Sequence, residues 1–443
     1  MNSNHSSPPP LSRRNFVLGV VNGALFIFGG ALVEPGTVLP AYALDLTGTV
    51  MGVGLLASVI SAGWNWPPVL FAGVMERTRS LMLHYRLWAV ARVALAWALL
   101  WAVLGAGRGQ PHALWLVAGL MLALSSAGGC SILAFMSVVS DTIPPRLRGR
   151  FFGIRYLLGG LLTLLGAWFV KRMLSEEQRA LFPSNYGWLF GASALLQTLA
   201  VLAFSFSEEY PRRVASRWLA PIAQLRRGRR LLSRDPDYRS IVIARLLLWT
   251  TSGLALPFLV PFALDELRVD PEAVGIFLPV SVLAYSLSNV LWSYLSDGPG
   301  NRILLVTSGL CYLVVPAMGL AAPLWSSQPA GTFLGVATSP AFWWMLAVFV
   351  VAGVSRAGQM VGHTNYLLEL SPERSRQTYL SFYYATSVPL SFLPVLGAVL
   401  IGEEGRYEIG FAITLLLSAL MLWVLYGLRE VREDESGTEG DGQ

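Results

Sequence analysis

Twelve apolar runs, each of about twenty residues, recur along the chain and constrain its fold more than any other feature. A transmembrane helix needs about 20 consecutive apolar residues. Only helices or closed barrels can span lipid, and these runs are too long for the strands of a membrane barrel. The sequence therefore predicts twelve spanning helices, at 16–39, 49–72, 81–104, 112–139, 151–170, 186–206, 241–264, 274–295, 303–321, 341–367, 379–401 and 407–428.

The composition excludes an ordinary soluble enzyme. Apolar residues make up 54% of the 443 residues and charged residues only 13%, against about 25% charged residues in an average soluble domain. The single lysine, Lys171, is followed by arginine, so the chain has no Walker-type phosphate-binding loop. No histidine is followed by glutamate, as the helix of a zinc protease requires. We expect no enzymatic activity, no cofactor and no metal site.

The runs fall into two groups of six, with a basic segment between them. We expect a disordered cytoplasmic N-terminus at 1–15, a six-helix bundle at 16–206, a basic cytoplasmic linker at 207–240, a second six-helix bundle at 241–428 and an acidic cytoplasmic tail at 429–443. The predicted fold class is an all-α integral membrane protein built of two six-helix bundles.

The distribution of basic residues predicts the orientation. With the N-terminus inside, the inner segments hold 21 arginine and lysine residues and the outer loops hold 6. Basic residues concentrate on the cytoplasmic side of membrane proteins. We therefore expect both termini and the linker at 207–240 in the cytoplasm. We expect this linker to lie on the inner leaflet rather than to bind nucleic acid.

Matching positions recur in the two halves in the same order, which indicates an internal duplication. At an offset of 221 residues, Pro40 matches Pro261 and Glu76 matches Asp297. At an offset of 228, the pattern acid-x-x-Pro-x-Arg-x-Arg occurs twice. Its charged members are Asp141, Arg146 and Arg148 in the first half and Glu369, Arg374 and Arg376 in the second. Parallel six-helix repeats with a binding site between them are a transporter architecture.

The loop at 293–302 resembles the signature Gly-x-Leu-x-Asp-Arg-x-Gly-Arg-Arg of the major facilitator superfamily (MFS), a family of secondary transporters. Asp297, Gly300 and Arg302 occupy the places of its Asp, second Gly and last Arg, whereas Ser293 and Gly298 replace its first Gly and first Arg.

Other segments extend the resemblance to about 16–428. The loop between the second and third runs is a degraded copy that keeps Arg77 and has Glu76 in place of Asp. The segment 141–149 is similar to the loop between helices 4 and 5 of the family, and 365–372 resembles a poorly characterised bacterial branch. The resemblance implies the MFS fold and the inner membrane of a bacterium.

The loop charges have two interpretations. The resemblance implies that they form a latch at the inner mouth, which closes in one state of transport and opens in the other. They could instead be static anchors of topology, with the arginines serving only orientation. The candidates are Asp297, Gly300, Arg302, Glu76, Arg77, Asp141, Arg146, Arg148, Glu369, Arg374 and Arg376.

Charged side chains inside apolar runs cost about 2.5 to 3.5 kcal/mol on insertion scales, so they are candidates for function. Glu34 precedes Pro35 and Gly36 in the first run, a pair that can loosen the helix there, and Arg356 lies near the middle of the tenth. The resemblance implies that these two helices line a central cavity. Gln359 and His363 follow Arg356 at i+3 and i+7, on one helical stripe, and are weaker candidates.

Two interpretations of each charge stay open. Glu34 could carry a coupling proton, because burial disfavours the charged form of a carboxyl group, or it could be a structural ion-pair partner. Arg356 could bind an anionic group of the substrate or pair with Glu34. Arg92 lies in the third run, which the resemblance places outside the cavity, so we expect it to serve structure within one half.

The resulting hypothesis is a secondary transporter that moves a small solute by alternating access, with protons as the candidate coupling ion. The alternative is a non-transporting membrane protein of the same fold, such as a sensor, an assembly factor or a chaperone for pigments or lipids. We expect a small-molecule substrate and the bilayer as partners, and a monomer.

Overall fold

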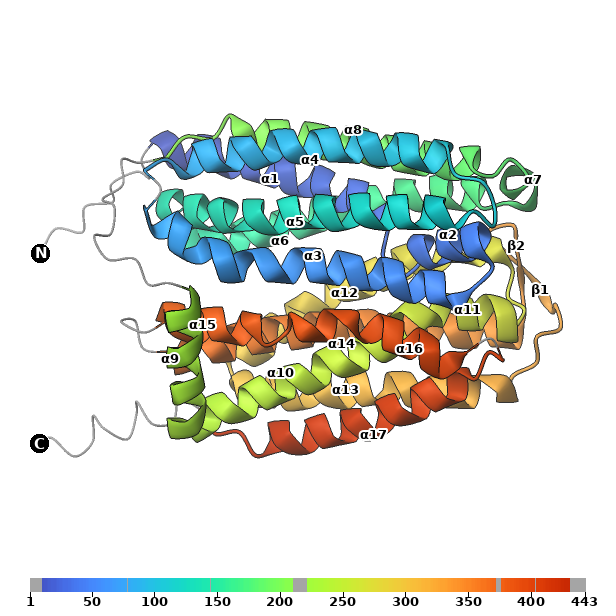
Figure 1. Cartoon of the computed structure of the whole chain (residues 1–443). Helices are drawn as coiled ribbons and strands as arrows, with labels where there is room; N and C mark the ends of the chain where they lie inside the picture. Colours follow the sequence, from blue (N-terminus) through green and yellow to red (C-terminus); the bar gives the residue numbers. More distant parts are fainter. Residues whose placement is uncertain are drawn as a thin grey trace, which may run out of the picture.

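The computed structural model describes residues 10–77, 79–143, 145–209, 221–371, 376–402 and 404–430, except for some side chains within these ranges. Long helices run side by side and form two halves (Figure 1). The first half comprises α1 (Pro10–Ala31), α2 (Val38–Thr47), α3 (Val50–Arg77), α4 (Leu81–Leu104), α5 (Pro111–Thr142), α6 (Pro145–Met173), α7 (Glu176–Arg179) and α8 (Ser184–Ser205).

A helix in the linker, α9 (Pro221–Arg234), precedes the second half. The second half comprises α10 (Pro236–Ala255), η1 (Leu256–Phe258), α11 (Leu259–Pro261), η2 (Phe262–Glu266), η3 (Pro271–Ala273), α12 (Val274–Asp297), α13 (Asn301–Ala321), η4 (Ala322–Leu324), β1 (Gly331–Phe333), β2 (Val336–Thr338), α14 (Pro340–Leu370), α15 (Arg376–Ala385), η5 (Pro389–Phe392), α16 (Leu393–Ile401) and α17 (Tyr407–Tyr426).

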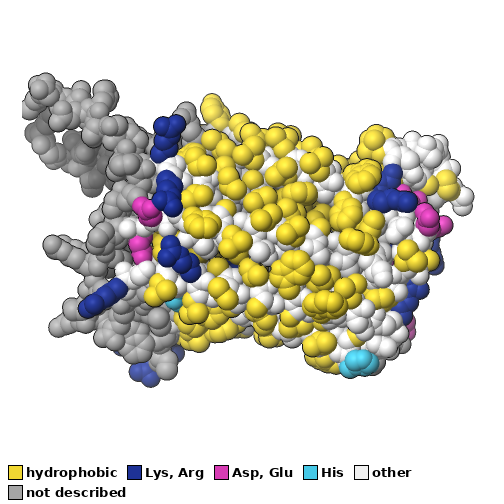
Figure 2. Space-filling view, turned by 90° about the horizontal axis from the view of Figure 1, so that it is seen from above, with side chains coloured by type: hydrophobic (Ala, Val, Ile, Leu, Met, Phe, Trp, Pro, Cys, Tyr) yellow, Lys and Arg dark blue, Asp and Glu magenta, His cyan; other side chains and the backbone are white. Residues whose placement is uncertain are grey.

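The prediction of an all-helical, multi-pass membrane protein is confirmed. Within the described residues, eleven helical segments are long and apolar enough to cross a membrane. The remaining predicted run, 49–72, coincides with the 28-residue helix α3. On the face shown in Figure 2, apolar side chains cover the middle of the molecule, and the charged side chains gather towards its two ends. This distribution fits a surface that faces lipid at its centre and water at both ends.

Four local features refine the prediction. Helix α1 begins at Pro10, so residues 10–15, expected to be disordered, are helical, and residues 1–9 lie outside the described part. The first span is broken between α1 and α2, because Pro35 has no amide hydrogen to donate to a continuous helix. The loop after α13 contains an antiparallel hairpin in which Thr332 pairs with Ala337, and the linker contains α9.

The two halves share one buried core at the end of the molecule opposite the termini. That core joins residues such as Tyr42 and Val170 of the first half with Phe277 and Ala398 of the second. The backbones also approach closely there, because a Cβ atom added at Gly275 would lie 2.6 Å from the Cβ atom of Lys171. The described halves are therefore packed together at this end.

Candidate functional site

The break between α1 and α2 places Glu34 beside a cavity between the two halves. The carbonyl oxygen of Glu34 accepts hydrogen bonds from the amides of Thr37 and Leu39, so this residue lies in the turn that leads into α2 rather than in α1. The cavity has a volume of about 310 Å³. Its lining is mainly apolar, with Tyr156, Tyr285 and a few small polar side chains, and Glu34 and Arg356 are the charged residues that line it.

Glu34 and Arg356 form an ion pair across the two halves. The Nη1 atom of Arg356 lies 3.7 Å from Oε1 of Glu34, and its guanidinium lies 5.4 Å from the ring centroid of Tyr285. The Arg356 side chain is 56% exposed, whereas that of Glu34 is 23% exposed. The ion pair is therefore long, and its arginine side chain is the more exposed partner. The guanidinium is thus the more accessible charge of the cavity.

The other two candidates on α14 lie in a different place. Gln359 is only 2% exposed, and its amide donates hydrogen bonds to the carbonyl of Leu305 at 3.2 Å and the hydroxyl of Ser308 at 2.9 Å. His363 is 3% exposed, and its Nδ1 atom lies 2.8 Å from the hydroxyl of Tyr383. Both side chains thus bond inside the second half. The three residues of the predicted stripe therefore lie in two environments. Arg356 faces the cavity, whereas Gln359 and His363 face the packed interior of the second half.

A second cavity, of about 260 Å³, lies inside the first half and was not predicted. Glu34 lines it together with Arg92 and apolar side chains of α1, α3, α4, α5 and α8. Arg92 donates a hydrogen bond to Gln197 at 3.1 Å, and its guanidinium lies 5.1 Å from the ring centroid of Phe26. These contacts agree with the expected place of Arg92 inside one half. Only the fold shows that Glu34 borders both cavities.

The loop candidates whose backbone is described lie at the end of the molecule that carries the termini. The side chains of Asp297, Glu76, Arg77, Asp141, Arg146, Arg148, Arg374 and Arg376 lie outside the described residues. Glu369 lies in the last turn of α14. Gly300 has φ of 107°, a conformation that favours glycine, and is the N-cap residue of α13. Arg302 donates a hydrogen bond to the carbonyl of Tyr426 at 2.9 Å, which ties it to α17 of its own half.

A matched pair of carboxylates caps one helix in each half. After α8, the carboxylate of Glu209 accepts hydrogen bonds from the amides of Leu81 at 2.8 Å and Met82 at 3.3 Å, at the start of α4. After α17, the carboxylate of Glu430 accepts one from the amide of Arg302 at 3.0 Å, at the start of α13. Glu209 and Glu430 are 221 positions apart, and so are the capped residues Leu81 and Arg302. Applying this offset to Glu209 would have found the pair in the sequence.

We expect Glu430→Ala to lower the free energy of unfolding by about 1 kcal/mol, because it leaves the amide of Arg302, in the first turn of α13, without its acceptor. Glu209→Ala should have a similar effect through α4. Thermal unfolding of the purified protein tests both. Glu404→Ala, which removes an exposed carboxylate at the opposite end, is the control and should leave the unfolding temperature unchanged. Unchanged stability in both capping variants would contradict this role.

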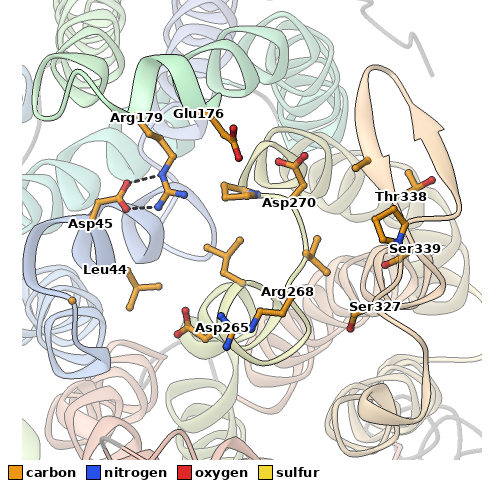
Figure 3. Close-up of a pocket in the computed structure, with 16 residues that line it drawn as sticks. Leu44, Asp45, Glu176, Arg179, Asp265, Arg268, Asp270, Ser327, Thr338 and Ser339 are labelled. Carbon is orange, nitrogen blue, oxygen red and sulfur yellow. Dashed lines mark hydrogen bonds and ion pairs between the residues drawn. The ribbon is translucent and has the colours of Figure 1, made fainter.

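A wider cavity, of about 670 Å³, is a charged depression at the end opposite the termini (Figure 3). Arg179 of α7 binds both carboxylate oxygens of Asp45 at the end of α2, and Asp265, Arg268 and Asp270 of the second half face the same space. Charges at a water-exposed end need no functional explanation, whereas charges at membrane depth do. The smaller central cavity is therefore the better candidate for the site.

Two helical halves around a charged central cavity define a transporter architecture. The sequence model of the Major Facilitator Superfamily matches residues 241–442. The sequence matches none of the curated proteins compared with it.

Several solved structures share the fold. A D-xylose–proton symporter is 12% identical, with a TM-score of 0.69 over 95% of this chain and 98% of that chain. A point mutant of the nucleoside transporter NupG is 13% identical, with a TM-score of 0.67 over 94% of this chain and 99% of that chain. A bacterial homologue of the iron transporter ferroportin, in the inward-facing state, is 14% identical, with a TM-score of 0.63 over 93% and 98%. The second half of the chain therefore matches the sequence model of the Major Facilitator Superfamily, and the chain as a whole shares the fold of these transporters.

Proposed function

We propose that the central cavity carries a small amphipathic molecule with an anionic group across the membrane. The observation that supports this most directly is the geometry of Arg356. Its side chain lines the cavity, is more than half exposed and pairs with a single carboxylate 3.7 Å away. An anionic group can therefore replace Glu34 at Arg356, while the apolar lining accepts the remainder of the molecule.

Coupling to protons follows from the same exchange. An anionic group on Arg356 would leave the Glu34 carboxylate without its cationic partner at membrane depth. A charge without a partner is costly there, so Glu34 would take up a proton. One anionic group and one proton would then enter the cavity together. This arrangement gives proton-coupled symport of an organic anion.

Alternating access supplies the movement. The halves are packed together at the end opposite the termini, and the Glu34–Arg356 pair joins them near the middle. Rocking of the halves about the central cavity would expose it to the other side of the membrane. Reconstituted protein tests the proposal: a carboxylate that raises the unfolding temperature should enter proteoliposomes faster when the outside is acidic. Binding without any uptake would favour the non-transporting alternative.

We further propose that the termini and α9 lie in the cytoplasm of a bacterial cell, because 21 basic residues lie on that side and 6 on the other. In a chain whose Cys130 and Cys311 are replaced, Gln328→Cys should react with an impermeant maleimide in intact cells. Ser233→Cys should react only after the cells are permeabilised. The reverse pattern would overturn the orientation but not the fold.

A further inference from the structure

Helix α9 lies across the direction of the long helices at the end of the molecule that carries the termini (Figure 1). Two apolar spans begin beside it, at Pro236 and at Phe382. The backbone of α9 touches the second of these, because a Cβ atom added at Gly228 would collide with the Phe382 side chain. The helix therefore lies at the depth where membrane-spanning segments begin, which is the level of the lipid headgroups.

The contact with Phe382 fixes the rotation of α9. Leu231 and Leu232, on the side of Gly228, pack against the buried core of the second half. At about 100° per residue, the arginines of the helix fall roughly 100° to 260° away from Gly228, on the opposite side. These arginines are Arg226, Arg227, Arg229, Arg230 and Arg234, and all five are exposed.

The arginine face has no acidic partner within the described part of the chain, because none of its five guanidinium groups forms an ion pair there. Five unpaired cations on one helix face repel one another and favour a polyanionic surface. At headgroup depth, that surface is supplied by anionic phospholipids. The guanidinium group also binds two phosphate oxygens at once, which a lysine cannot do.

We propose that the arginine face of α9 binds the phosphate groups of anionic lipids, and that bound lipid holds α9 against the bundle. Helix α9 contacts α10 and α15 of the second half and α3 of the first. Lipid bound to the arginine face therefore holds in place a helix that contacts both halves at the inner end. Anionic lipid then stabilises the arrangement described here.

The test compares phosphatidylglycerol with phosphatidylcholine added to the full-length protein in neutral detergent. We expect phosphatidylglycerol to raise the unfolding temperature, and R226Q/R227Q/R229Q/R230Q to lose at least half of this shift. The matched control R108Q/R172Q/R268Q/R406Q removes the same charge at the opposite end and should keep the full shift. Equal shifts in the wild type and both variants would overturn the proposal.

The acidic residues of the segment 431–443 are the competing occupant of this face. A chain ending at Glu430 distinguishes them from lipid. An unchanged phosphatidylglycerol shift supports lipid, whereas a shift that occurs only in the shortened chain would overturn the proposal in favour of the tail.

A second measurement keeps α9 intact in case the fourfold variant does not fold. A nitroxide on Ser233→Cys, with Cys130 and Cys311 replaced, reports on contact with lipid. Its accessibility to oxygen should rise when phosphatidylglycerol is added to phosphatidylcholine vesicles. Equal accessibility in both kinds of vesicle would contradict lipid binding by this face.

Discussion

Replacing Arg356 by alanine is expected to weaken the binding of an anionic ligand by more than tenfold, or about 1.4 kcal/mol, while changing stability little. The guanidinium is the accessible cation of the central cavity. Its pairing with Glu34 is long and partly solvated, and such pairs contribute less than about 1 kcal/mol. A fully buried pair would instead cost about 3 to 5 kcal/mol when one partner is removed.

Binding and stability separate the two interpretations of Arg356. Carboxylates that raise the unfolding temperature of the wild type are titrated by calorimetry against Arg356→Ala and against Arg108→Ala, an exposed arginine at the far end. Thermal unfolding without ligand is then compared for Arg356→Ala, Glu34→Gln and the double variant. A large loss of stability in Arg356→Ala that Glu34→Gln partly restores would make the pair structural and exclude substrate contact.

Replacing Glu34 by glutamine is expected to abolish uphill accumulation of the substrate and to leave downhill exchange intact. The amide imitates the protonated carboxyl group but cannot release or take up a proton. The side chain would still fit beside Pro35 at the break between α1 and α2, so folding should be preserved. The loss should therefore be confined to the coupling of transport to the proton gradient.

Proteoliposomes with an imposed pH gradient measure uphill accumulation, and preloaded vesicles without a gradient measure exchange. Glu176→Gln removes a carboxylate of the charged depression at the opposite end and serves as the matched control. Accumulation retained in Glu34→Gln would move proton coupling to another residue. Loss of both accumulation and exchange would indicate a structural role for Glu34.

The positions of the spans could be predicted from the sequence. Lipid offers no hydrogen-bond partners to the backbone, so a long apolar run must form a helix that satisfies its own backbone groups. A loosened helix at Pro35 was also expected, since proline cannot continue a helical hydrogen-bond ladder. The helix α9 was not predicted, because its arginine-rich sequence was interpreted only as a basic linker on the inner leaflet. The capping role of Glu209 and Glu430 was not predicted, because the comparison of the halves did not extend to the segments after the sixth and twelfth runs.

Glu34 and Arg356 could be identified as candidates, because a charge inside an apolar run is conspicuous. Their pairing could not be established, because 322 residues separate them and neither residue carries a signal about the other. Gln359 and His363 share a stripe with Arg356 in the sequence but bond inside the second half. Helical periodicity gives the angles between side chains around one helix. The helices packed against it decide which of these side chains face the cavity.

The amino-acid sequence alone determined the fold class, because lipid leaves few alternatives to a bundle of helices once the apolar runs are present. It also determined which charges lie at membrane depth. The tertiary structure decided everything that depends on packing between distant segments: the pairing of Glu34 with Arg356, the two cavities that Glu34 borders, and the rotation of α9. These features arise from contacts between helices far apart in the chain, and local sequence preferences do not specify such contacts.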